Sequence, residues 1–255
     1  MRTFLLCLVA SILTACSTSS GNPTTYAYKI EDTIRDNTDS KRLIIAHVNF
    51  GKPSRLYLQD YEQRVDDFLK AYLKKHGYNF VSSALFEQAW QESVRKHGNP
   101  FDESTGKLNQ KTFQLVVADT VNQLKERNDV DYVMFTDLIE REVQFTTGIS
   151  HVARWDGVTR KPSLQGPGDG IPGGFNWAAS VDAVSLWVNV FSLDLALQFQ
   201  SAGGIEVTQA IDMKASNPKF IRRRTILGNK SNIEEGIKLA MHPLVAMKGY
   251  PGEKK

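Results

Sequence analysis

The 255-residue chain contains almost no cysteine. Its two cysteines, Cys7 and Cys16, both lie close to the N-terminus. The long region after residue 16 therefore has no disulfide, no thiol nucleophile and no cysteine-based metal site. Its stability must come from a hydrophobic core, and a chain of this length is large enough to bury one.

Long hydrophobic runs and a strong net charge are also missing. After residue 16 no segment is long and apolar enough to read as a membrane helix. The formal net charge is only +3, whereas nucleic-acid binding calls for a concentrated basic surface. The sequence therefore predicts no nucleic-acid partner.

The familiar motifs of enzymes and metal sites are absent from the sequence. There is no His-Glu-x-x-His and no Gly-x-Ser-x-Gly, and residues 166–174 are glycine-rich but lack the Gly-Lys-Ser/Thr ending of a phosphate loop. No two of the five histidines have the spacing of metal ligands on a helix; they are His47, His76, His97, His151 and His242. We therefore expect no metal, no cofactor and no catalytic set built on these motifs.

The N-terminus carries the most specific pattern in the chain. Met1-Arg2 gives a positive start, an apolar run follows to Ile12, and the run ends in Leu13-Thr14-Ala15-Cys16. This ending resembles the bacterial lipobox. The resemblance implies a signal peptide over residues 1–15 and lipid on Cys16, and Ser17 after the cysteine implies the periplasmic face of the outer membrane. The alternatives are an ordinary secreted protein and a short membrane helix with a chance cysteine.

Residues 16–40 are interpreted as the lipidated cysteine followed by a flexible tether, because Ser, Thr, Gly, Asn and Pro are frequent up to about Thr25. Residues 41–250 are interpreted as a single domain. Its first half alternates short apolar runs with amphipathic stretches. The predicted strands are Arg42–Phe50, Tyr78–Val81 and Asp129–Phe135, the last continuing to about Phe145, and the predicted helices are Leu58–Tyr72, Leu85–Lys96 and Asn109–Arg127.

The second half of this domain has a different pattern, with few amphipathic stretches. Residues 146–180 form an irregular, glycine-rich insertion, and Val181–Phe199 is a long strand whose apolar alternation changes phase after Val190, which predicts a bulge or a change of face. Ala202-Gly203-Gly204 is predicted to be a hairpin turn, with a returning strand over 205–211. A capping box at Ser231–Glu234 opens a last helix. The predicted fold is α/β, a mixed sheet with packed helices in the order β-α-β-α-α-β-β-β-α.

Several stretches resemble the CsgG-like and TolB N-terminal-like group of envelope proteins. They are Val81–Glu92, Val130–Ile139, Leu193–Phe199 with Ala202–Glu206, and the closing helix Ile233–Ala240. The resemblance implies the fold and the compartment. It also implies a role in protein–protein assembly within the envelope, without catalysis.

Two groups of residues are candidate partner contacts. Trp155, Phe175 and Trp177 flank the glycine-rich loop, and aromatic side chains dominate the energetics of interfaces. Arg222, Arg223 and Arg224 end the densest basic cluster, which could meet a phosphate-bearing lipid, an acidic polymer or an acidic partner. The alternatives are local packing of the aromatic rings and a solvated or edge-protecting role for the arginines.

The leading functional hypothesis is a non-enzymatic outer-membrane lipoprotein that scaffolds or regulates an envelope assembly or secretion machine, bound to an envelope protein or to copies of itself. One alternative is a cell-wall hydrolase that uses a carboxylate pair, Asp129 with Asp131 or Glu140 with Glu142, since alternate strand residues share a face. The other is a polysaccharide binder whose site is lined by Trp155 and Trp177.

Overall fold

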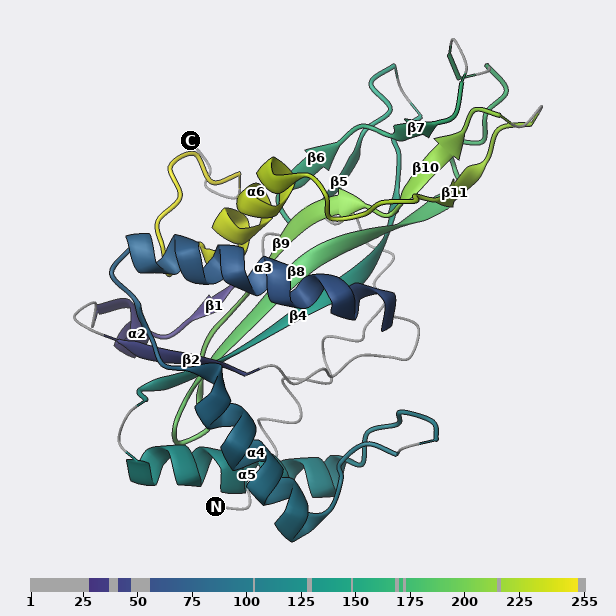
Figure 1. Cartoon of the computed structure of the whole chain (residues 1–255). Helices are drawn as coiled ribbons and strands as arrows, with labels where there is room; N and C mark the ends of the chain where they lie inside the picture. The colour runs from purple at the N-terminus through teal and green to yellow at the C-terminus, as the bar shows by residue number, and fades with distance from the viewer. Residues whose placement is uncertain are drawn as a thin grey trace.

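The computed structural model (Figure 1) describes residues 28–36, 41–46, 56–102, 104–127, 130–147, 149–167, 170–171, 173–214 and 217–251. Cys16, the signal peptide and most of the tether lie outside the described residues. So do Asp129 and residues 47–50 of the predicted strand Arg42–Phe50, including His47.

A six-stranded mixed sheet forms the centre of the molecule, in the order β1-β9-β8-β4-β2-β3. The middle strands β2, β4, β8 and β9 span Arg42–Ala46, Tyr132–Gln144, Ser180–Ser192 and Leu197–Val207, and the edges β1 and β3 are Lys29–Ile30 and Asn79–Phe80. Strand β2 runs parallel to β3 and β4, whereas β4, β8, β9 and β1 pair antiparallel. Such a mixed sheet with packed helices confirms the predicted α/β class.

Helices cover both faces of this sheet because alternate strand residues point in opposite directions. On one face Leu43 and Ile45 share a core with α3 (Leu56–Lys75) and α6 (Lys230–Met241). On the other face Ile44 packs with α4 (Ser83–His97) and α5 (Gln110–Arg127). Figure 1 shows the two helix layers on opposite sides of the sheet.

The predicted element order is found in β2, α3, β3, α4, α5, β4, β8, β9 and α6, so periodicity identified the main scaffold. The phase change after Val190 also has a counterpart, a register shift between β8 and β9 at Val190 and Phe191. Elements that the pattern did not predict are α2 (Asp32–Asp36) and the short strands β1, β5 (Ala153–Trp155), β6 (Val158–Arg160), β7 (Ser163–Gln165) and β11 (Phe220–Arg222). The predicted strand over 205–211 is divided between the end of β9 and a separate strand, β10 (Gln209–Asp212).

The glycine-rich insertion is more regular than predicted. Strands β5 and β6 form a hairpin around Asp156 and Gly157, whose φ angles are 35° and 86°. Strand β7 joins β10 and β11 in a three-stranded sheet, in the order β11-β10-β7. We call this sheet the arm; in Figure 1 it lies at the upper right, beyond the helices. Short hydrogen-bonded strands thus replace much of the expected irregular segment.

The predicted turn at Ala202-Gly203-Gly204 is wrong, because these residues lie inside β9. The turn between β8 and β9 is instead formed by residues 193–196, where Leu195 has a φ of 60°. The predicted capping box is also displaced. The side chain of Asn229 caps α6 by accepting hydrogen bonds from the backbone N–H groups of Ser231 and Asn232.

Candidate functional site

An aromatic cluster lies between the arm and the central sheet. The Phe175 ring centroid is 4.8 Å from that of Trp177 and 5.1 Å from that of Phe220, and the Phe220 ring stacks on Phe145 at 5.6 Å. His151 stacks on Trp177 at 3.7 Å. Phe175 is buried and Trp177 is half-buried, so the predicted aromatic residues pack mainly on one another and on the arm. Phe220 and His151 are half-buried as well, so the cluster is only partly closed to solvent.

Trp155 occupies a different place from the other two predicted aromatics. It lies in β5, is 1% exposed, and belongs to a core cluster with Leu239 of α6 and Val207 of β9. Its Nε1 donates a hydrogen bond to the carbonyl of Val184 at 3.4 Å. The expected role of Trp155 as a partner contact does not fit this position, and a glycan site lined by Trp155 and Trp177 does not fit it either.

The three consecutive arginines separate into three environments. Arg222 places its guanidinium 3.9 Å from the ring centroid of Tyr57. Arg223 turns inward, where its Nη1 lies 3.2 Å from Oε2 of Glu206 and donates to the carbonyl of Val207 at 3.0 Å. Arg224 is exposed. The three arginines therefore do not form a single basic contact surface.

Three carboxylates share one face of the sheet at the arm end of β4 and β8. Glu142 lies opposite Asp182 in the ladder, and Glu140 is two residues from Glu142 on the same side. The hydroxyl of Tyr57 donates a hydrogen bond to Glu140. Burial, followed by the charge of Glu140, raises the pKa of Asp182, and Arg222 opposes this rise. The Tyr57 hydroxyl also has a raised pKa, mainly through burial.

The second predicted carboxylate site is an ion pair. Asp131 accepts from the backbone N–H of Arg42 at 2.8 Å and from Nη2 of Arg42 at 2.9 Å. These bonds hold the pKa of Asp131 below its usual range. Among the described residues no group of three His, Cys, Asp or Glu side chains could hold a metal ion. The ion pair between Asp131 and Arg42 thus joins the starts of β2 and β4, and this contact gives the Asp131 carboxylate a structural role.

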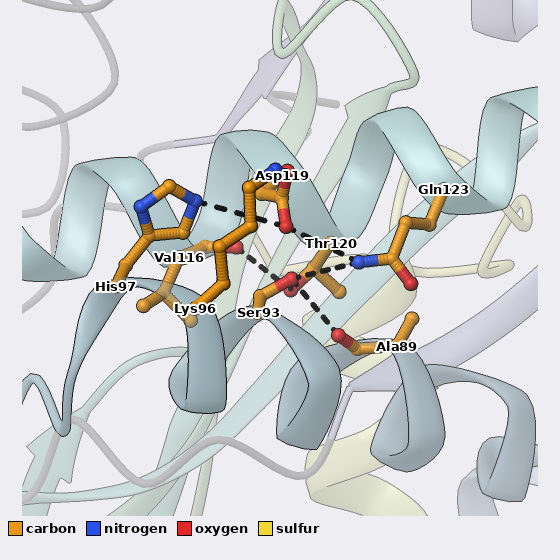
Figure 2. A network of polar contacts seen from close by, with 8 residues as sticks. All are labelled: Ala89, Ser93, Lys96, His97, Val116, Asp119, Thr120 and Gln123. Atoms are coloured by element: carbon orange, nitrogen blue, oxygen red, sulfur yellow. Dashed lines mark hydrogen bonds and ion pairs between the residues drawn. The ribbon is translucent and has the colours of Figure 1, made fainter.

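A further polar network joins α4 to α5, and no sequence motif pointed to it (Figure 2). Ser93 donates to the carbonyl of Ala89 at 2.9 Å and accepts from Nε2 of Gln123 at 3.1 Å. Asp119 accepts from Nζ of Lys96 at 2.6 Å, and this hydrogen bond is the main reason for its lowered pKa. A sequence signal for this network does exist. Polar residues occupy a few positions on the sides of α4 and α5 that face each other, where the other residues are apolar.

This network contains serine, histidine and aspartate without the geometry of a nucleophile. Ser93 is fully buried, so no substrate reaches its hydroxyl. Nε2 of His97 lies 3.7 Å from Oδ2 of Asp119 and points at that carboxylate, not at Ser93 (Figure 2). The network therefore serves as a polar clamp between two helices.

The arm presents an exposed apolar residue together with exposed cations. Of the exposed large hydrophobic side chains among the described residues, Leu164 of β7 is 52% exposed and belongs to the arm, whereas Tyr28, Leu115 and Ile149 lie outside its strands. The exposed cations Lys161, Lys214, Lys219 and Arg224 each lie within two residues of an arm strand. This surface, and not a cleft, is the candidate functional site.

Comparison with protein-family models gives no match, and comparison with curated proteins gives none. Among solved structures, the chain is similar to PelC from Paraburkholderia phytofirmans, a variant described as a dodecamer, with 11% identity and a TM-score of 0.30. The alignment covers 82% of this chain and 91% of that one. Within the described part of the chain, no helix has the length and apolar character needed to cross a membrane.

Proposed function

We propose that this chain is a lipoprotein of the outer membrane that faces the periplasm and acts without catalysis, as a scaffold or regulator of an envelope assembly or secretion machine. The observation that carries the proposal is the N-terminal pattern, in which Leu13-Thr14-Ala15-Cys16 follows a positive start and a short apolar run. Lipid on Cys16 would hold the domain at the membrane, and the tether would let it reach partners beside the surface.

Polar side chains that could act in catalysis are instead bonded to other parts of the fold, which supports a role without catalysis. Ser93 is bonded between two helices, Glu140 is bonded to Tyr57, and Glu206 is paired with Arg223. Each of these contacts joins elements of the fold, which is the ordinary role of buried polar groups. The arm offers a partner an exposed apolar residue, Leu164, with exposed cations next to its strands.

The lipid anchor is tested with two matched cysteine variants. Wild type and Cys7→Ser should both be labelled by a palmitate analogue and recovered with the outer membrane, because Cys7 lies in the segment removed at cleavage. Cys16→Ser should lose the label and leave the outer-membrane fraction. Labelling that survives Cys16→Ser, or a wild-type protein that takes up no label, would contradict the proposal.

The scaffold role is tested by crosslinking the lipidated protein in native envelopes and identifying what is recovered with it. A defined envelope protein, or an assembly of the chain with itself, is the expected result. Cell-wall material cleaved by the purified protein, with cleavage lost in a folded double variant Glu140→Gln/Asp182→Asn, would replace the scaffold by the hydrolase.

A further inference from the structure

Strand β7 forms one edge of the arm. Its residues, Ser163–Gln165, pair in parallel with β10, and β10 pairs on its other side with β11. Across the described residues no strand is paired with the other edge of β7. Edge strands present unpaired backbone groups, and proteins usually protect them with charge, proline or a bulge.

The free backbone groups of β7 belong to Leu164. The carbonyl of Gln165 accepts a hydrogen bond from the backbone N–H of Met213 at 2.9 Å, so Gln165 faces β10. Because successive residues of a strand direct their backbone groups to opposite edges, Leu164 directs its N–H and its carbonyl away from β10. These are the groups that an added strand would use.

The side chain of Leu164 gives the same edge an apolar character. It lies in register with Ile211, which in turn faces Phe220, so the three side chains share one face of the arm. Ile211 is fully buried beside the aromatic cluster, whereas Leu164 is 52% exposed. The apolar face of the arm therefore extends to the unpaired edge of β7, at Leu164.

Three exposed cations lie close to β7. Lys161 lies just before β7. Lys214 lies beside its end, because a Cβ added at Gly166 would lie 2.6 Å from Cγ of Lys214. Arg224 is also adjacent, since its backbone N–H donates to the side-chain oxygen of Gln165 at 3.3 Å. Asp212 is the acidic residue of the described arm, and its carboxylate accepts from the backbone N–H of Lys214.

We propose that β7 is a docking edge for an extended, acidic segment of a partner protein, which adds to the arm as a further strand. Backbone hydrogen bonds to Leu164 would set its register, an apolar side chain would cover Leu164, and carboxylates would pair with Lys161, Lys214 and Arg224. The inference rests on the proposed scaffold function and names the surface and the partner chemistry.

A second copy of the chain is a poorer occupant of this edge. Two β7 edges placed side by side would bring Lys161, Lys214 and Arg224 of each copy together, and like charges across strands are destabilising. An acidic segment removes this repulsion and adds attraction. The charge around β7 therefore favours a different protein over self-pairing.

Binding can be tested with a defined probe on the lipidated full-length protein in nonionic detergent. The probe is a short fluorescent peptide that alternates Glu and Val, and the control peptide alternates Lys and Val. Fluorescence anisotropy should show saturable binding of the acidic peptide alone, weakening with salt. No saturable binding below about 1 mM, or equal binding of both peptides, would overturn the proposal.

Variants separate the backbone contribution from the charge contribution. Leu164→Pro removes an N–H that faces away from β10, so it should weaken the acidic peptide about tenfold or more while circular dichroism is unchanged. Lys214→Glu/Arg224→Glu should cause a similar loss, and it keeps the test decisive if the proline variant unfolds. Leu115→Ala, at an exposed leucine of α5, is the matched control and should bind as wild type does. Unchanged binding by both arm variants contradicts the proposal.

A photocrosslinking residue in place of Leu164 distinguishes this inference from the scaffold function. In native envelopes it should capture a protein with an acidic extended segment, whereas the same residue at position 115 should not. Capture of a second copy, or no capture while the whole protein still recovers its partner, would overturn the docking edge and leave the scaffold function standing. Failure to recover any partner at all would contradict both.

Discussion

Gly203 of β9 and Gly236 of α6 meet backbone to backbone. A Cβ atom added at Gly203 would lie 1.9 Å from the carbonyl oxygen of Gly236, and one added at Gly236 would lie 2.8 Å from the carbonyl oxygen of Gly204. No side chain separates the helix from the strand at this point. The two glycines therefore set how deeply α6 sits on the sheet, and with it the core that α6 shares with α3.

Replacing Gly203 by alanine should destabilise the protein strongly. The new methyl group would meet backbone atoms, which cannot rotate away, so α6 would have to shift; we expect a loss of about 3 kcal/mol or more in the free energy of unfolding. Gly173→Ala is the control, because a Cβ there has open space around it. Urea denaturation of both variants measures the difference, and equal stability would show that α6 can move at little cost.

The neighbouring arginines Arg223 and Arg224 should behave very differently. Glu206 is 2% exposed; its Oε1 accepts from the backbone N–H of Leu227, whereas its Oε2 accepts no hydrogen bond from a described residue and faces the guanidinium of Arg223. Arg223→Ala leaves a buried charge unpaired and should cost about 3 kcal/mol or more. Arg224→Ala removes an exposed side chain and should change stability by less than about 0.5 kcal/mol.

Thermal and urea denaturation of these two arginine variants give the comparison directly. A double variant, Arg223→Ala/Glu206→Gln, should recover part of the lost stability, because it removes the unpaired charge. If Arg223→Ala and Arg224→Ala are equally mild, Glu206 is compensated by another group and the inward role of Arg223 is wrong.

The sequence predicts the scaffold well because periodicity reports burial. The apolar spacing of α3 and the short apolar runs of β2 and β4 each have one explanation, a face that packs on the core. The β5–β6 hairpin was also predictable, since Asp156-Gly157 is a strong signal for a two-residue turn with positive φ. Its strands are only three residues long, too short for a period-two apolar pattern to show.

Other features depend on contacts that a local pattern does not contain. Gly203 and Gly204 predict a turn when read locally, but they are needed because α6, Val158 and Trp155 approach the strand closely. Trp155 stands near a glycine-rich loop in the sequence, yet it is buried in a core cluster formed by several strands and Leu239 of α6. Arg222 is the last residue of β11 and Arg223 follows it, and successive residues of an extended chain face opposite sides, which becomes evident only once β11 is identified as a strand.

Asp182 and Asp131 should give stability profiles of opposite slope with pH. The pKa of Asp182 is raised in the folded protein, so between its unfolded value near 3.8 and its folded value the native state holds more protons than the unfolded state. The free energy of unfolding should therefore fall as pH rises through that window. Asp182→Asn removes this fall and should make the protein more stable at neutral pH than the wild type.

Asp131 has a lowered pKa, so its stabilising contribution is present above 3.8 and is lost as pH falls through its folded value. Asp131→Asn should therefore lower stability at neutral pH, by about 1 kcal/mol or more, and should matter least in acid. Urea denaturation of wild type and both variants between about pH 3 and pH 7 measures the slopes. Parallel profiles for the two variants would contradict the assignment, because burial beside Glu140 and pairing with Arg42 must act on a carboxylate in opposite directions.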